Sequence, residues 1–198
     1  MASGGFDILS HIMETYFSPC DAENVSDDIS EALMRGVIRD LRASLANRSD
    51  YDARSNLMWE STMAENRIIK LGKKGDFQCH QMEHQLGAYT DCNHGAGLAV
   101  LHPALYRHIC EAGAAKFARF ARNVWGIEEK ATELETARAG VAALADFIKE
   151  IGLPASFTEM GIDPNTDFKA VADSTNITAG CCKKLTHEEI LEIFNECR

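Results

Sequence analysis

Apolar residues recur along most of this chain at spacings of three and four, which is the period of a helix that packs one face against a core. The segment from Glu128 to Glu150 shows this best, with one apolar stripe made of Leu134, Ala137, Val141, Leu144 and Ile148. No alternating run of β-branched residues reaches the length of a strand. The pattern therefore predicts an all-α fold.

Turn and capping residues divide the pattern into successive helices. We expect them over residues 6–17, about 26–45, 51–69, 77–88, 103–110, 112–124 and 128–150, near 167–172, and from Thr186 onward. Each proline lies where a helix can begin or end, and the first helix is expected to end before Pro19. Thr186 and Glu189 form a capping box. Because no repeat or linker interrupts the pattern, we predict one multi-helix domain over residues 1–198.

Composition and charge narrow the classes of partner. The 198 residues carry a formal net charge of −10 without a basic run, which is a poor match for nucleic acid or anionic lipid. No apolar run reaches the roughly 18 residues of a membrane helix. Seven cysteines, an odd number without a Cys-x-x-Cys pair, do not form a disulfide framework. We therefore expect a protein of the reducing cytoplasm that binds neither nucleic acid nor membrane.

Histidines and one carboxylate form the candidate metal-binding set. Asp7 and His11 lie four residues apart on the first expected helix, so their side chains face one way. His80 and His84 repeat this spacing, and His94 follows in an expected loop. Each pair alone is more typical of a surface or a core, but a carboxylate with two or three imidazoles suits Zn²⁺ or Fe²⁺. The joint pattern indicates a divalent metal site.

Other residues with notable chemistry are interpreted as structural. Large aromatic rings usually bury in the core, so Trp59 and Trp125 are expected to anchor it. No glycine-rich loop lies between a strand and a helix, so we predict no residues that bind a dinucleotide. The remaining side chains interpreted as structural or surface residues are His102, His108, His187, Cys181 and Cys182.

Two segments carry a resemblance to a known family. GFDILSHIMETYF and CHQMEHQLGAYTDCNHGAGLAVLHPALYRH resemble the C-terminal helical half of the iron-containing alcohol dehydrogenases, with the closest likeness to the butanol dehydrogenase-like branch of this dehydroquinate synthase-like superfamily. YDARSNLMWESTMA, IGLPASFTEMGI and KKLTHEEILEIF extend the likeness over the whole chain. The resemblance implies that Asp7, His11, His80 and His94 bind the catalytic metal. It places His84 beside the metal, near nicotinamide and substrate, in a polar or proton-relay role.

The resemblance also implies the reaction. The metal is expected to be Fe²⁺, or Zn²⁺ or another divalent ion in its place, and the substrate a small alcohol or aldehyde that exchanges a hydride with NAD(P). In the family a separate N-terminal half binds the nucleotide, and this sequence resembles only the helical half. NAD(P) is therefore expected only where a nucleotide-binding domain is supplied, and the isolated chain should bind one metal ion with little activity.

One alternative from another class remains open. The chain could be a non-enzymatic, helical metal-binding or subunit-interaction module. In either case, the face that meets the other half in the family should expose apolar side chains, and such a patch favours association. We therefore expect a homo-oligomer.

Overall fold

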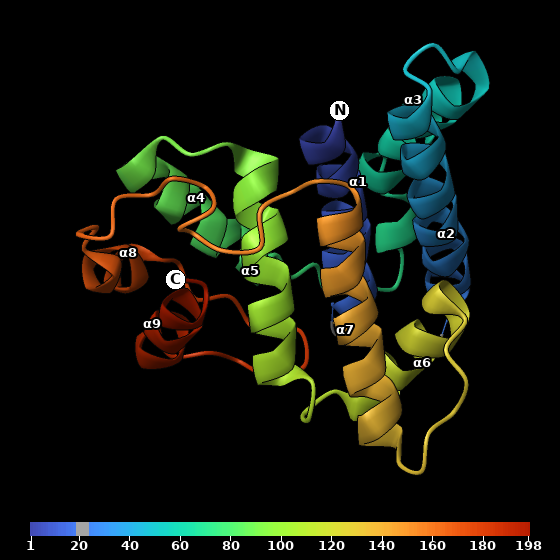
Figure 1. Cartoon of the computed structure of the whole chain (residues 1–198). Coiled ribbons are helices and arrows are strands. Elements are labelled where there is room, and N and C mark those ends of the chain that lie inside the picture. Colours follow the sequence, from blue (N-terminus) through green and yellow to red (C-terminus); the bar gives the residue numbers. More distant parts are fainter. Residues whose placement is uncertain (19–23) are drawn as a thin grey trace.

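Helix α1 (Ala2–Phe17) runs through the middle of the molecule, and the other helices are arranged around it (Figure 1). The structure is a computed structural model that describes residues 1–18 and 24–198. Within these residues every regular element is a helix, which confirms the all-α prediction. The helix ends at Phe17, as expected, whereas Pro19 lies outside the described residues.

Most of the remaining helices flank α1 in two groups. On one side α2 and α3 pack against α1 and against each other, and on the other side α4, α5, α8 and α9 pack together, with α5 touching α1 (Figure 1). Helices α6 and α7 pack as a pair, with α6 against α2 and α7 against α5. Their bounds are α2 Val25–Ala46, α3 Tyr51–Glu65, α4 Gln78–Thr90, α5 His94–Ile109, α6 Ala114–Trp125, α7 Glu133–Glu150, α8 Phe168–Ser174 and α9 His187–Glu196, with a 3₁₀ turn at Ile68–Lys70.

Side-chain caps start several of these helices. The capping box predicted at Thr186 and Glu189 is present, and Thr132 with Glu135 forms a second one at the start of α7. Helix α2 begins earlier than predicted, because Asn24 accepts the backbone N–H of Asp27 and so acts as its N-cap. These caps satisfy backbone N–H groups that have no partner within the helix.

The prediction for α5 was wrong at both its start and its proline. The helix begins at His94, not at Pro103, so His94 is its first residue and Pro103 lies inside it. An internal proline costs about 3 kcal/mol. Leu98, Leu101 and Leu105 are buried on the same helix, and burying each such side chain gains about 1.5–3 kcal/mol. Burial therefore outweighs the cost of the proline.

The buried apolar side chains form one continuous core. Trp125 belongs to its edge, in ring contact with Phe120 and Phe147. The prediction that Trp59 anchors the core was wrong, because 66% of this residue is exposed on α3. Among the described residues, none of the helices has the combination of length and apolar character that crossing a bilayer takes.

A buried polar network joins α1, α2 and α6. Glu31 accepts hydrogen bonds from the hydroxyl of Tyr16 at 2.9 Å, from Nε of Arg119 at 2.5 Å and from the amide of Asn123 at 2.9 Å. Burial and the neighbouring carboxylate raise the pKa of Tyr16, so its hydroxyl keeps its proton and stays a donor. The charge of Glu31 is thus buried but paired, which makes the network costly to break from one side.

Candidate metal centre

Helix α1 places Asp7 and His11 one turn apart, as the spacing predicted. The distance from Oδ1 of Asp7 to Nε2 of His11 is 3.5 Å. Both side chains are only partly buried, although α1 is otherwise covered on most of its surface. The two residues therefore lie in the N-terminal part of α1, which is partly exposed, whereas residues 12–17 of the helix are buried.

Helices α4 and α5 bring the other two histidines to the same point. His80 lies in the first turn of α4 and is buried, and the short connection to α5 places His94 opposite it. Asn93 fixes the start of α5, because its side chain accepts the backbone N–H of Ala96 and the hydroxyl of Ser3 on α1. The N-terminal ends of α1 and α5 are thereby held together beside the histidines.

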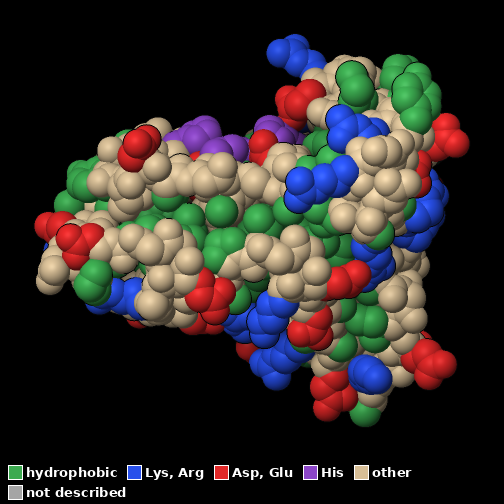
Figure 2. Space-filling view, turned by 45° about the horizontal axis from the view of Figure 1, so that its top comes forward, with side chains coloured by type: hydrophobic (Ala, Val, Ile, Leu, Met, Phe, Trp, Pro, Cys, Tyr) green, Lys and Arg blue, Asp and Glu red, His purple; other side chains and the backbone are tan. Residues whose placement is uncertain are grey.

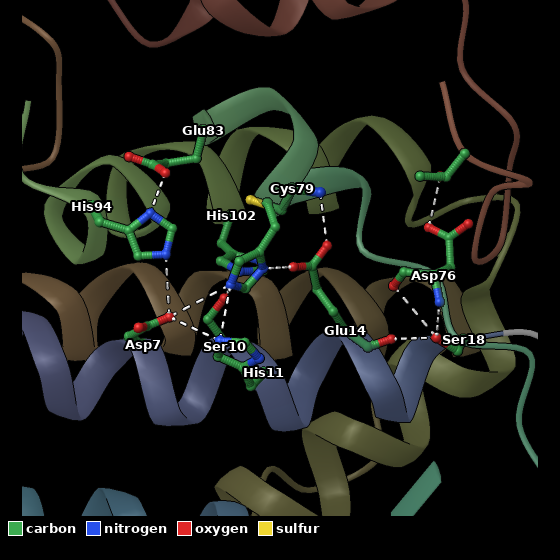
Figure 3. A network of polar contacts seen from close by, with 12 residues as sticks. Asp7, Ser10, His11, Glu14, Ser18, Asp76, Cys79, Glu83, His94 and His102 are labelled. Atoms are coloured by element: carbon green, nitrogen blue, oxygen red, sulfur yellow. Dashed lines mark hydrogen bonds and ion pairs between the residues drawn. The ribbon is translucent and has the colours of Figure 1, made fainter. Parts of the chain in front are cut away.

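The three predicted histidine ligands converge on one oxygen atom of the fourth, Asp7. Oδ1 of Asp7 lies 3.5 Å from Nε2 of His11, 3.5 Å from Nε2 of His80 and 3.7 Å from Nε2 of His94. Figure 3 shows Asp7 facing His94 across this cluster. The two nitrogens of His11 and His80 are 3.2 Å apart. Two ligands at about 2.1 Å from a tetrahedral ion stand about 3.4 Å apart, so these spacings match those within a ligand set.

Burial supports the same reading of the geometry. Oδ1 of Asp7 is buried and has no hydrogen-bond partner, although a buried carboxylate oxygen normally has one. The donor atoms of Asp7, His80 and His94 all lie within 4.8 Å of one another, and His11 joins them through Asp7 and His80. Three imidazole nitrogens surround a carboxylate oxygen that has no hydrogen-bond partner. This set of donor atoms fits a divalent cation.

The electrostatics of the cluster favour a negative Asp7. Burial opposes its ionisation, but the contact with His80 and the neighbouring histidines outweigh burial and hold the pKa of Asp7 below its ordinary value. Burial likewise opposes a charge on His80, yet Asp7 and Glu14 raise its pKa to about 9. A cation that takes Nε2 of His80 would therefore replace a proton there.

His84 lies at the rim of this cluster and outside the set of convergent atoms. It follows His80 by one turn of α4 and is exposed, and its ring stacks on His94 with 5.6 Å between centroids. Desolvation and the neighbouring His80 and His94 lower its pKa. Figure 2 shows histidine side chains exposed next to one another along the upper edge of this face.

An apolar groove opens beside two of the predicted ligands. It lies between α1 and α3, has a volume of about 700 Å³, and is lined by Asp7 and His11 together with Ile8, Leu57 and Met58. Arg54, Thr62 and Glu65 also line it, so the groove combines an apolar wall with polar groups beside the predicted ligands.

Sequence reasoning missed two carboxylates of the cluster. Glu14 contacts Nδ1 of His80, and Glu83 contacts Nδ1 of His94; both glutamates are buried. The sequence held only a weak signal for them, since each follows a predicted ligand by three residues on the same helix, Glu14 after His11 and Glu83 after His80. The residues that the sequence analysis left out of the site are thus two glutamates that contact the predicted histidine ligands.

The other three histidines lie in contacts away from the cluster, and His187, which was expected at the solvated surface, is half-buried. His102 is fully buried and 2.7 Å from the hydroxyl of Ser10, and burial holds its pKa well below the ordinary value. His108 pairs with Glu189 at 3.3 Å. The ring of His187 lies 3.0 Å from a backbone carbonyl oxygen of the chain.

The sequence of the chain is similar to those of known proteins over most of its length. The chain is 36% identical over 199 residues to NADH-dependent butanol dehydrogenase A of Clostridium acetobutylicum, covering 98% of this chain and 51% of that protein. It is 32% identical over 164 residues to the NADPH-dependent aldehyde reductase YqhD of Escherichia coli, covering 82% of this chain and 42% of that protein. The chain thus spans about half the length of the curated relatives it matches.

Solved structures share the fold. The crystal structure of an NADH-dependent butanol dehydrogenase A from Thermotoga maritima superposes with a TM-score of 0.90 at 31% identity, covering 99% of this chain and 51% of that one. Residues 1–197 also match the C-terminal part of one family. The helical architecture and the sequence therefore lead to one conclusion: the chain belongs to the Fe-containing alcohol dehydrogenase family and corresponds to its C-terminal domain.

Proposed function

We propose that this chain is the metal-binding half of an NAD(P)-dependent alcohol dehydrogenase or aldehyde reductase. Asp7, His11, His80 and His94 would hold Fe²⁺, or Zn²⁺ in its place. The observation that carries this proposal is the approach of three Nε2 atoms to the buried, unpartnered Oδ1 of Asp7. When bound, a divalent cation supplies a Lewis acid that polarises the oxygen of an alcohol or an aldehyde.

The chain's own residues bind and orient the substrate. The groove lined by Ile8, Leu57 and Met58 takes the carbon chain of a small alcohol or aldehyde and keeps water from it, while Asp7 and His11 lie where the oxygen must come. His84, exposed beside His94, is placed to exchange a proton between the substrate and solvent. This assigns His84 a proton-relay role without direct ligation.

NAD(P) binding belongs to another domain in this proposal. The described residues contain no strand, so they lack the strand-to-helix loop that cradles a pyrophosphate. The relatives, of which this chain spans about half, have names that specify NADH in one case and NADPH in another. We therefore expect the isolated chain to bind metal but to be nearly inactive until a nucleotide-binding domain is supplied.

Metal analysis tests the proposal. Anaerobically purified protein should contain one divalent ion per chain, and His94→Ala and Asp7→Asn should lose most of it. His187→Ala removes a histidine outside the cluster and is the matched control, which should retain the ion. Equal, sub-stoichiometric metal in the wild type and in all three variants would show that the ligand assignment is wrong.

A second candidate, a subunit-interaction module, is favoured by one observation. Tyr51, Met58 and Trp59 on α3 are between 66% and 79% exposed, although they are large and apolar. Such a patch is typical of an interaction surface, and it fits the prediction of a homo-oligomer. Light scattering at high protein concentration tests it: a strictly monomeric chain would count against this candidate.

A further inference from the structure

We infer that Glu14 and Glu83 are positioning residues that orient His80 and His94 toward the metal site by binding their Nδ1 atoms. The inference rests on the proposed metal-binding function and deepens it. In a neutral imidazole with its proton on Nδ1, the lone pair is on Nε2, which is the atom a metal takes. Metal-bound histidines usually donate their other N–H to such a carboxylate, which fixes both the tautomer and the ring orientation.

Glu14 is held at both of its oxygens. It lies on α1, one turn after His11, and is only 4% exposed. One oxygen contacts Nδ1 of His80. The other accepts the backbone N–H of Cys79 at 2.7 Å, and Figure 3 shows Glu14 and Cys79 facing each other. The carboxylate can therefore neither rotate away nor turn to solvent. The ring of His80 is left with Nε2 directed at Asp7.

Glu83 repeats the arrangement one helix further on. It lies on α4, is 2% exposed, and contacts Nδ1 of His94 at the start of α5 (Figure 3). Gly97 leaves the space for it, because a Cβ at this position would lie 2.8 Å from Cγ and from Oε1 of Glu83. A close approach of this kind requires glycine at residue 97. The close packing of α5 against α4 at Gly97 thus provides the space in which the carboxylate of Glu83 lies.

In both contacts, the glutamate and the histidine that it holds lie on different helices. Glu14 comes from the helix of Asp7 and His11 but holds a ligand of α4, and Glu83 comes from α4 but holds a ligand of α5. Each carboxylate therefore fixes the ligand of the neighbouring helix. All three helices are locked into one arrangement before a cation arrives, which is preorganisation of the site.

His11 provides an internal comparison. Its Nδ1 lies 2.5 Å from Glu65, but the contact is not aligned as a hydrogen bond. The side chain of Glu65 is 52% exposed and is shared with Lys70 at 3.5 Å. A water molecule can replace an exposed acceptor at little cost. Glu65 should therefore matter less than the two buried glutamates.

Metal affinity measured on isosteric variants tests the inference. Glu14→Gln and Glu83→Gln keep the shape of the side chain and one acceptor but remove the charge. We expect each to raise the dissociation constant for Zn²⁺ about 10–100-fold, as measured by competition with a chromophoric chelator. Glu65→Gln should change it less than either. Glu60→Gln, which alters a buried carboxylate away from the histidines, is the matched control and should bind as the wild type does.

Two further measurements separate orientation from general structural damage. Gly97→Ala leaves every ligand and carboxylate in the chain but forces Glu83 to move, so it should reproduce the loss of Glu83→Gln. The visible absorption of bound Co²⁺ should change in Glu14→Gln and Glu83→Gln, because ligand orientation sets its spectrum. Far-UV circular dichroism without metal should match the wild type.

The results distinguish a failure of the positioning role of Glu14 and Glu83 from a failure of the proposed metal-binding function. If wild-type protein binds one ion but Glu14→Gln and Glu83→Gln bind it with unchanged affinity and spectrum, the inference is overturned. If the wild type binds none, or His94→Ala binds equally well, the proposed function itself fails. Two ions per chain, one of them lost with Glu83, would make Glu83 a direct ligand together with His84 and His94, whose donor atoms lie within 4.8 Å of one another, and would overturn its positioning role.

Discussion

A buried pair of carboxyl groups between α2 and α3 should make this protein less stable as the pH rises. Glu60 on α3 is 6% exposed and lies against Asp40 on α2. Its carboxyl group also lies over Gly36, where a Cβ would collide with Oε1. Desolvation first, and then the charge of Asp40, raise the pKa of Glu60 from 4.5 to about 7.

The direction and size of the effect follow from proton linkage. Between pH 4.5 and about 7 the folded state keeps a proton on Glu60 that the unfolded state has lost, so the folded state binds more protons. The free energy of unfolding therefore falls as the pH rises through this window and levels off above it. At about 1.4 kcal/mol for each pH unit, the loss amounts to at most about 3 kcal/mol.

Urea denaturation at pH 5, 6, 7 and 8 measures this, and Glu60→Gln isolates the residue. Glutamine is uncharged at every pH, so its variant should lack the part of the pH dependence that comes from Glu60. The wild type should lose about 2–3 kcal/mol more than the variant between pH 5 and pH 8, because part of the effect is already lost at pH 5. Parallel curves for the two proteins would refute the reasoning, because they would mean that Glu60 ionises alike in the folded and unfolded states.

Three further predictions concern stability, each to be measured by urea or thermal denaturation. Glu31→Ala removes the acceptor of the buried Tyr16 hydroxyl and of Nε of Arg119, whose guanidinium still pairs with Asp28, and should cost about 1–3 kcal/mol; an unchanged free energy of unfolding would show that water replaces the carboxylate. Thr132→Ala removes the capping box of α7 and should cost about 1 kcal/mol, so an unchanged midpoint would contradict the capping role. Trp59→Ala should change stability by no more than about 0.5 kcal/mol, because the ring is mostly exposed; a loss of several kcal/mol would place it in contact with another copy of the chain.

Helical periodicity was sufficient to predict most of the fold. A stripe such as that of α7 has one solution, since only one face can be buried. Pro103 shows where local rules stop: proline ends helices in isolation, but the buried leucines of α5 outweigh its cost, and that balance depends on neighbours far along the chain. Trp59 failed for a similar reason, because aromatic residues on α3 could be assigned to either of its faces.

For the candidate site, the sequence predicted the four candidate ligands but not the glutamates that contact them. Spacing placed Asp7 with His11, and His80 with His84, on common helix faces, and the structure brings Asp7, His11, His80 and His94 to one point. Their role as ligands stays a prediction. The glutamates that hold Nδ1 could not be ranked from the sequence, because many glutamates precede or follow histidines and only burial distinguishes these two.

The central position of α1 has a consequence for synthesis of the chain. Helix α1 contacts partners far downstream; His11 and His80, for example, are separated by 69 residues. At roughly 5–20 residues per second, ribosomes need about 3–14 s to bridge that interval. During this time Phe6, Leu9 and Met13, which are fully buried in the finished fold, have no α5 to cover them. Until α5 has been synthesised, the apolar face of α1 therefore stays uncovered on that side and offers a chaperone an apolar surface to bind.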